Sequence, residues 1–152
     1  QRQMCIRDRL KTEIIKSNYI TNEKENLVVS FDQIKKNILS KSFNVIDARS
    51  LERFEGKVSE PRKGLRSGHI QNSFCLPFNQ CINQKTGEFK NLEELRELFN
   101  QNENIEKRLD QVFTCGSGVT AAVLAYAYKM VNNDYIPKIY DGSWSEYGKY
   151  PA

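Results

Sequence analysis

The chain has 152 residues, of which 39% are hydrophobic and 28% charged, and it carries a net charge of +4 at pH 7. These values are typical of one globular domain with a real core and exclude a wholly disordered chain. The positive charge is small and scattered, which argues against a nucleic-acid partner. No apolar run reaches the length of a transmembrane helix, which argues against a membrane-spanning protein.

The chain divides into a polar start and an ordered remainder. Residues 1–26 are charged, with scattered apolar positions, and are predicted to be a linker or tail. The opening QRQMCIRDR, residues 1–9, fits nothing downstream, so we interpret it as foreign to the natural protein, and Cys5 is left without a role. Residues 27–152 are predicted to form the single domain.

The first half of the domain predicts a helix, two strands and a long loop. Ser30 is a suitable N-cap for a helix over residues 31–39, where apolar side chains recur at helical spacing. The β-branched run FNVIDA and the run SFCLPF, which contains Pro77, are predicted strands at 43–48 and 73–78. Residues 55–68 are polar and contain three glycines, which predicts a loop.

The second half predicts alternating helices and strands. Asn91 begins a helix NLEELRELF, with Glu94 at the capping-box position. The remaining predicted elements are a strand at 111–114, a helix at 119–130, a strand at 138–141 and an aromatic tail at 142–150. This alternation predicts an α/β fold whose parallel sheet is covered on both faces.

Four cysteines and one histidine limit the possible metal and redox chemistry. The cysteines form no C-x-x-C pair, and His69 has no nearby cysteine, so no zinc site is predicted. A reducing compartment is favoured because a chain with this much core does not need disulfides. Cys75 and Cys81 are interpreted as core or surface filler, and His69 as a residue that holds backbone groups in place.

Cys115 differs from the other cysteines in its position. It follows a predicted buried strand and precedes a helix, at the sheet edge where ligands gather in α/β proteins. Gly116 and Gly118 would allow a tight turn whose N–H groups form an anion-binding nest, and the helix dipole adds positive potential. These features predict a thiol with a lowered pKa that acts as a nucleophile. The alternative is a structural cysteine in a strand-to-helix turn.

Other cysteine chemistries fit less well. A tyrosine-phosphatase loop needs an arginine six positions after the cysteine, and Ala121 stands there. A cysteine protease needs a general-base histidine, and His69 is the only histidine in the sequence. A thioredoxin-type site needs a second cysteine nearby.

The sequence CGSGVTA, residues 115–121, resembles the active-site loop of rhodanese-like sulfurtransferases of the mercaptopyruvate type. Three more stretches match the same family in the same order, namely VIDARSLERFEGKVSEPRKGLRSGHI at 45–70, SFCLPF, and YDGSWSEYG at 140–148. The resemblance implies a rhodanese-like three-layer α/β/α domain with a central, mainly parallel sheet. It also implies that the chain is the C-terminal, catalytic domain of a tandem pair, with a missing N-terminal rhodanese domain as its partner.

The resemblance further implies a persulfide mechanism. The thiolate of Cys115 would take sulfur from a small-molecule donor, and backbone N–H groups of residues 116–120 would stabilise the outer sulfur. A thiol acceptor such as thioredoxin would then remove it. By resemblance, the loop residues that contact the substrate are Gly116, Gly118, Val119 and Thr120. No metal or cofactor is required, and the expected location is the cytoplasm or the mitochondrion.

Donor preference is argued from charge. Thiosulfate-type members resemble the pattern Cys-Arg-Lys-Gly, whereas Gly116 and Ser117 supply no cations here, which favours 3-mercaptopyruvate. By resemblance, Arg53 and Arg62 bind the donor carboxylate, and Ser117 assists proton transfer at the departing enolate or shapes the loop. The alternatives are a thiosulfate sulfurtransferase and a rhodanese module that binds or regulates without turnover.

Two further groups are given structural roles. Asp47 and Arg49, in a motif shared with the family, are expected to fix neighbouring loop amides. Trp144 and Tyr147 are expected to pack the aromatic tail against the sheet, although this aromatic edge could also border the pocket.

Overall fold

The central sheet of the computed structural model is built from short apolar runs of the sequence. The structure describes residues 18, 20–21, 26–101 and 105–151. Within them, β1 (Phe43–Asp47), β2 (Ser73–Cys75), β3 (Asp110–Thr114) and β4 (Lys138–Ile139) form one sheet in the order β2-β1-β3-β4. All three pairings are parallel, with Ile46 of β1 beside Phe74 of β2 and Phe113 of β3. The predicted linker or tail, including Cys5, lies almost entirely outside the described residues.

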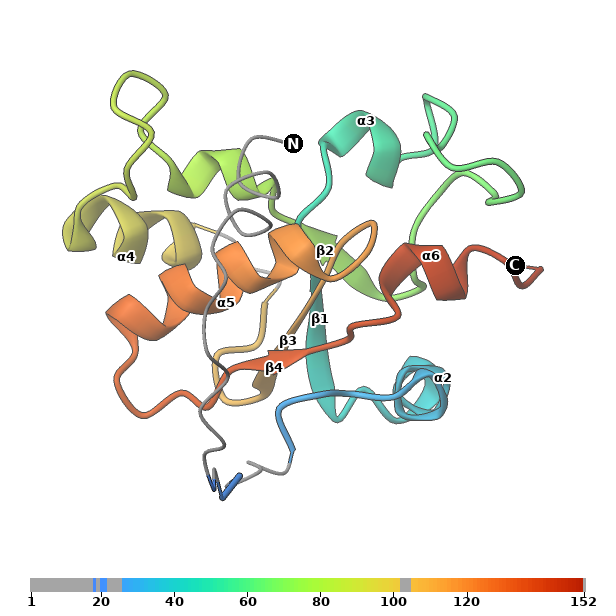
Figure 1. The fold of residues 1–152 in the computed structure, drawn as a ribbon, viewed down its shortest axis with the longest axis horizontal. Coiled ribbons are helices and arrows are strands. Elements are labelled where there is room, and N and C mark those ends of the chain that lie inside the picture. The colour runs from blue at the N-terminus through green and yellow to red at the C-terminus, as the bar shows by residue number, and fades with distance from the viewer. Residues whose placement is uncertain (1–17, 19, 22–25, 102–104, 152) are drawn as a thin grey trace.

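Helices cover both faces of this sheet. They are α2 (Phe31–Ser40), α3 (Leu51–Phe54), the 3-10 helix η1 (Phe78–Cys81), α4 (Leu92–Asn100), α5 (Val119–Val131) and α6 (Ser143–Tyr147). In Figure 1, α4 and α5 lie on one side of the strands, whereas α2 and α6 lie on the other. The expected three-layer α/β/α arrangement is therefore confirmed.

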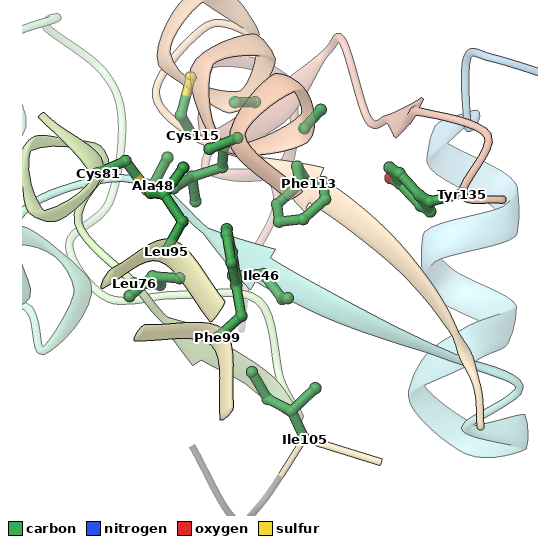
Figure 2. Close-up of a cluster of buried hydrophobic side chains, with 14 residues drawn as sticks. Ile46, Ala48, Leu76, Cys81, Leu95, Phe99, Ile105, Phe113, Cys115 and Tyr135 are labelled. Carbon is green, nitrogen blue, oxygen red and sulfur yellow. The ribbon is translucent and has the colours of Figure 1, made fainter. Parts of the chain in front are cut away.

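Each face of the sheet has its own hydrophobic core, because successive strand residues point to opposite faces. Ile46 and Phe113 belong to the first core, which includes side chains of α4 and α5 (Figure 2). Their neighbours Val45 and Val112 belong to the second, which includes Ile34 of α2 and Trp144 of α6. The burial of Trp144 confirms that the aromatic tail packs against the sheet.

Both predicted helix caps are present. The Ser30 hydroxyl accepts the N–H of Gln33 at 3.3 Å, and the Gln33 side chain accepts the N–H of Ser30 at 2.8 Å. Asn91 and Glu94 make the same reciprocal pair at the start of α4. These boxes satisfy backbone donors that the first turn leaves unpaired.

Some elements differ from the prediction in length or kind. β2 ends at Cys75, because Pro77 has no N–H and the chain turns into η1. β4 has two residues, after which the chain leaves the sheet to form α6, where only an aromatic tail was predicted. The short helix α3 was not predicted either.

Candidate active site

Cys115 lies directly after β3 and four residues before Val119, where α5 begins. The residue is buried, and Figure 2 shows its sulfur at the border of the first core, directed away from Ile46 and Phe113. The backbone N–H of Ser117 donates to its Sγ over 3.4 Å. The strand, loop and helix thus hold the sulfur at the carboxyl edge of the sheet, where the sequence placed it.

The surroundings of the sulfur favour the thiolate. Burial by itself would raise the pKa of Cys115. Hydrogen bonds from the Thr120 hydroxyl and from the amides of Ser117, Ala121 and Thr120 outweigh burial, and the net pKa is lower than the ordinary value. The amides that contact the sulfur therefore extend to residue 121, one position beyond the predicted stretch.

Glycine is favoured at positions 116 and 118 of the loop for different structural reasons. Gly118 has a φ of +81°, and a Cβ there would lie 2.6 Å from Oδ1 of Asp141, so both conformation and space require glycine. Gly116 is outside the left-handed region, so of the two glycines only Gly118 has a backbone conformation that favours glycine. A Cβ at position 116 would lie 3.1 Å from Nη2 of Arg53, so this glycine lets a guanidinium approach the loop.

A pocket of about 240 Å³ opens beside the sulfur. It brings together all of the predicted site residues except Gly118, which is buried behind the loop. The lining residues are Arg53, Glu60, Pro61, Arg62, Leu65, Cys115, Gly116, Ser117, Val119 and Thr120. The Cys115 thiol and two guanidinium groups therefore share one small cavity.

The two arginines are held differently. Arg53 donates through Nε and Nη2 to the carboxylate of Glu60, at 3.2 and 2.5 Å, and this carboxylate also pairs with Arg49 at 2.8 Å. Arg62 donates through Nη1 to the carbonyl oxygen of Gly116 at a long 3.4 Å. Arg53 is thus oriented by a buried carboxylate, whereas Arg62 is loosely attached to the loop.

Two further residues belong to this region, although they were not predicted from the sequence. Glu60 is one, and only its place between two arginines in the loop could have drawn attention to it. Ser143 is the other: its hydroxyl accepts the N–H groups of Cys115 and Gly118 at 3.2 and 3.0 Å. It lies 28 residues after the cysteine, and no local pattern indicates the contact.

Asp47, Arg49 and His69 make the structural contacts that were expected from the sequence. The Asp47 carboxylate accepts the backbone N–H of Arg49 at 2.9 Å and pairs with its guanidinium. The Nδ1 atom of His69 lies 2.9 Å from the carbonyl oxygen of Phe54, and the two rings stack.

The other described cysteines are poor nucleophiles, as expected of filler residues. Burial raises the pKa of Cys75 to about 12 and that of Cys81 to about 11. All three cysteines in the described part of the chain are free thiols.

The described residues contain no group of three or more acidic, histidine or cysteine side chains that could hold a metal ion. Among their helices, none is long and apolar enough to cross a membrane.

A strand-loop-helix cysteine with converging amides, set in a sheet of this topology, defines a class of protein. Residues 30–150 match the family model of the rhodanese-like domain, and the chain belongs to that family.

The relatives narrow the comparison to sulfurtransferases. The chain is 41% identical to thiosulfate/3-mercaptopyruvate sulfurtransferase 1, mitochondrial, of Arabidopsis thaliana, over 86% of its own length and 34% of the relative. It is 39% identical to human 3-mercaptopyruvate sulfurtransferase, over 79% and 39%. The solved sulfur transferase subunit of yeast mitochondrial complex I matches with a TM-score of 0.73 and 31% identity, over 88% and 46%. The chain therefore spans less than half the length of each of these relatives.

Proposed function

We propose that this chain transfers sulfur from 3-mercaptopyruvate to a thiol acceptor through a persulfide on Cys115. The observation that carries the proposal is the convergence of the Thr120 hydroxyl and three backbone amides on a buried sulfur whose pKa is lowered. Such donors stabilise the thiolate before the reaction and the terminal sulfur of a persulfide after it.

The chemistry requires only the groups that line the pocket. The Cys115 thiolate attacks the sulfur of the donor, an S–S bond forms, and the C–S bond breaks. The electron pair of that bond leaves with carbon as the enolate of pyruvate, which takes up a proton. Ser117 lines the pocket and is the loop hydroxyl proposed to assist that proton transfer.

The charges around the pocket support a donor with a single carboxylate. Among the lining residues, the cation of Arg53 is balanced by its partner Glu60, and Arg62 adds one positive charge. The loop positions 116 and 117 add none. A monoanion such as mercaptopyruvate matches this balance better than the dianion thiosulfate does. Thiosulfate remains the second candidate, because the name of the Arabidopsis relative includes both donors.

Partners and location belong to the same proposal. Reduced thioredoxin would remove the sulfur, with no metal or cofactor involved. We propose that the chain is the C-terminal member of a tandem pair, because by resemblance that member carries the cysteine. The chain's span of only 34% and 39% of the plant and human relatives is compatible with one member of such a pair. A thiolate enzyme suits a reducing compartment, the cytoplasm or the mitochondrion.

Intact-mass measurement after incubation with mercaptopyruvate tests the proposal. The wild-type chain should gain the mass of one sulfur atom, Cys115→Ser should gain none, and Cys75→Ser and Cys81→Ser should behave as wild type. A rhodanese module without turnover would show no added sulfur on any variant. A persulfide on Cys115→Ser would assign the chemistry to another residue.

A further inference from the structure

The segment that follows β4 touches the Cys115 loop at several points. The hydroxyl of Ser143, the first residue of α6, accepts hydrogen bonds from the N–H groups of Cys115 and Gly118. It donates its own proton to the carbonyl oxygen of Tyr140 at 2.8 Å. The Thr114 hydroxyl at the end of β3 also donates to the Ser143 hydroxyl, at 3.3 Å, so the hydrogen-bonding capacity of the Ser143 hydroxyl is fully used within the protein.

These contacts tie the two ends of the Cys115 loop, residues 115 and 118, to Ser143. The amides of residues 115 and 118 point to Ser143, whereas those of Ser117, Thr120 and Ala121 donate to the sulfur. In addition, the N–H of Trp144 donates to the carbonyl oxygen of Cys115 at 2.9 Å. The division of the loop amides between two acceptors therefore depends on an anchor behind the loop.

The backbone of Ser143 points to the same conclusion. Its φ is +52°, a left-handed conformation that is uncommon for a residue other than glycine. The side chain is completely buried. A strained residue persists only where its surroundings hold it, and such residues gather at functional sites.

We propose that Ser143 is a positioning residue, whose hydroxyl holds both ends of the Cys115 loop so that the remaining amides converge on the sulfur. Its importance for catalysis rests on the proposed role of Cys115, but its effect on the thiol does not require any donor.

Two variants separate the hydroxyl from the backbone strain. Ser143→Gly removes the hydroxyl and relieves the positive φ, whereas Ser143→Ala removes the hydroxyl and keeps the strain. The measurement is the rate at which Cys115 reacts with iodoacetamide, followed by peptide mass across pH. In both variants the midpoint should move to higher pH than in wild type, and persulfide formation at pH 7 should slow by about tenfold or more.

Tyr140→Phe is the matched control. It removes a hydroxyl from the same segment, one that donates to Glu146 at 2.7 Å and makes no contact with the loop. This variant should lose some stability but keep the wild-type midpoint.

A purely structural role predicts a different result. The proposal is overturned if circular dichroism shows that Ser143→Gly is folded and its iodoacetamide reaction has the same pH midpoint as wild type. This holds whether or not Ser143→Ala folds. If wild type takes up no sulfur from any donor, the proposed function fails, whereas the comparison of labelling midpoints still decides the role of Ser143.

Discussion

Glu60 shows how one buried carboxylate can set the charge of a pocket. Its side chain is only 2% exposed and pairs with both Arg49 and Arg53, and Arg49 pairs in turn with Asp47. Two cations and two carboxylates thus compensate one another behind the pocket wall. A buried charge must be paired in this way, since an unpaired one is strongly destabilising. Arg53 therefore presents little net charge to the pocket.

Glu60→Gln should therefore shift donor preference toward thiosulfate. The change keeps the shape and one accepting oxygen but adds one positive charge next to the donor site. The ratio of kcat/KM for thiosulfate to that for mercaptopyruvate should rise by about tenfold, because the added attraction is greater for a dianion. Sulfur transfer to cyanide with each donor measures this ratio.

Glu52→Gln is the control for net charge. Glu52 is exposed on α3 and does not line the pocket, so its change adds the same charge at a distance from the donor. Its donor ratio should equal that of wild type. An unchanged ratio in Glu60→Gln would show that the buried carboxylate does not select the donor.

Arg62 and Arg53 give a related prediction for mercaptopyruvate itself. Either arginine changed to alanine should weaken mercaptopyruvate use, because a charge-assisted hydrogen bond to the carboxylate is worth about 1.5–3 kcal/mol, or roughly ten- to a hundredfold. The effect should fall on kcat/KM. Arg53→Ala also leaves Glu60 with one partner fewer, so its folding should be checked by thermal unfolding.

At the scale of elements, the loop between β3 and α5 is constrained at Gly118 by both backbone conformation and space. Gly118→Ala forces a side chain into a left-handed position and against Asp141. It should destabilise the fold by more than about 1 kcal/mol and abolish persulfide formation. Gly116→Ala has no positive φ to maintain and would contact only the end of the Arg53 side chain, at 3.1 Å, so it should cost less. Urea unfolding and intact mass measure both variants, and equal losses would contradict the distinction between the two glycines.

Helices and strands with a local signal were predictable from the sequence. Helix α2 begins after its predicted N-cap Ser30, and α4 begins where its predicted capping box places it, because cap chemistry is local. The apolar runs that became β1 and β3 are buried on both faces, so their hydrophobicity alone indicates them. Cys115 could be placed for the same reason, since it follows such a run.

Elements that depend on tertiary contacts were not predictable. The five residues of α6 form a helix where Trp144 enters the second core and where backbone groups bind the Cys115 loop. The contact between Ser143 and the loop joins two β-strand ends that only the sheet brings together. The buried Glu60 likewise sits in a polar loop, where a carboxylate would ordinarily be solvated.

At the scale of the whole molecule, both cores contain groups that must remain neutral. The raised pKa values of Cys81 in the first core and Tyr140 in the second both arise mainly from burial, and that of Cys75 does too. Since the two cores share one sheet, loss of either should unfold the domain as a unit. The stability of the domain at alkaline pH therefore depends on whether these thiol and phenol groups keep their protons.

The free energy of unfolding should accordingly fall above pH 9. A thiol whose pKa is raised from 9.0 to about 11, as in Cys81, stabilises the fold fully below pH 9 and loses this contribution as the pH rises toward 11. Cys115 acts in the opposite sense: its lowered pKa adds stability as the pH rises to 9, and this contribution is lost as the pH falls through its folded value. Urea unfolding between pH 7 and 10.5 should thus show a maximum near pH 9. In Cys81→Ala, the free energy of unfolding should decline less above pH 9. In Cys115→Ser, it should rise less below pH 9. A profile that is unchanged in both variants would mean that these thiols are not linked to folding.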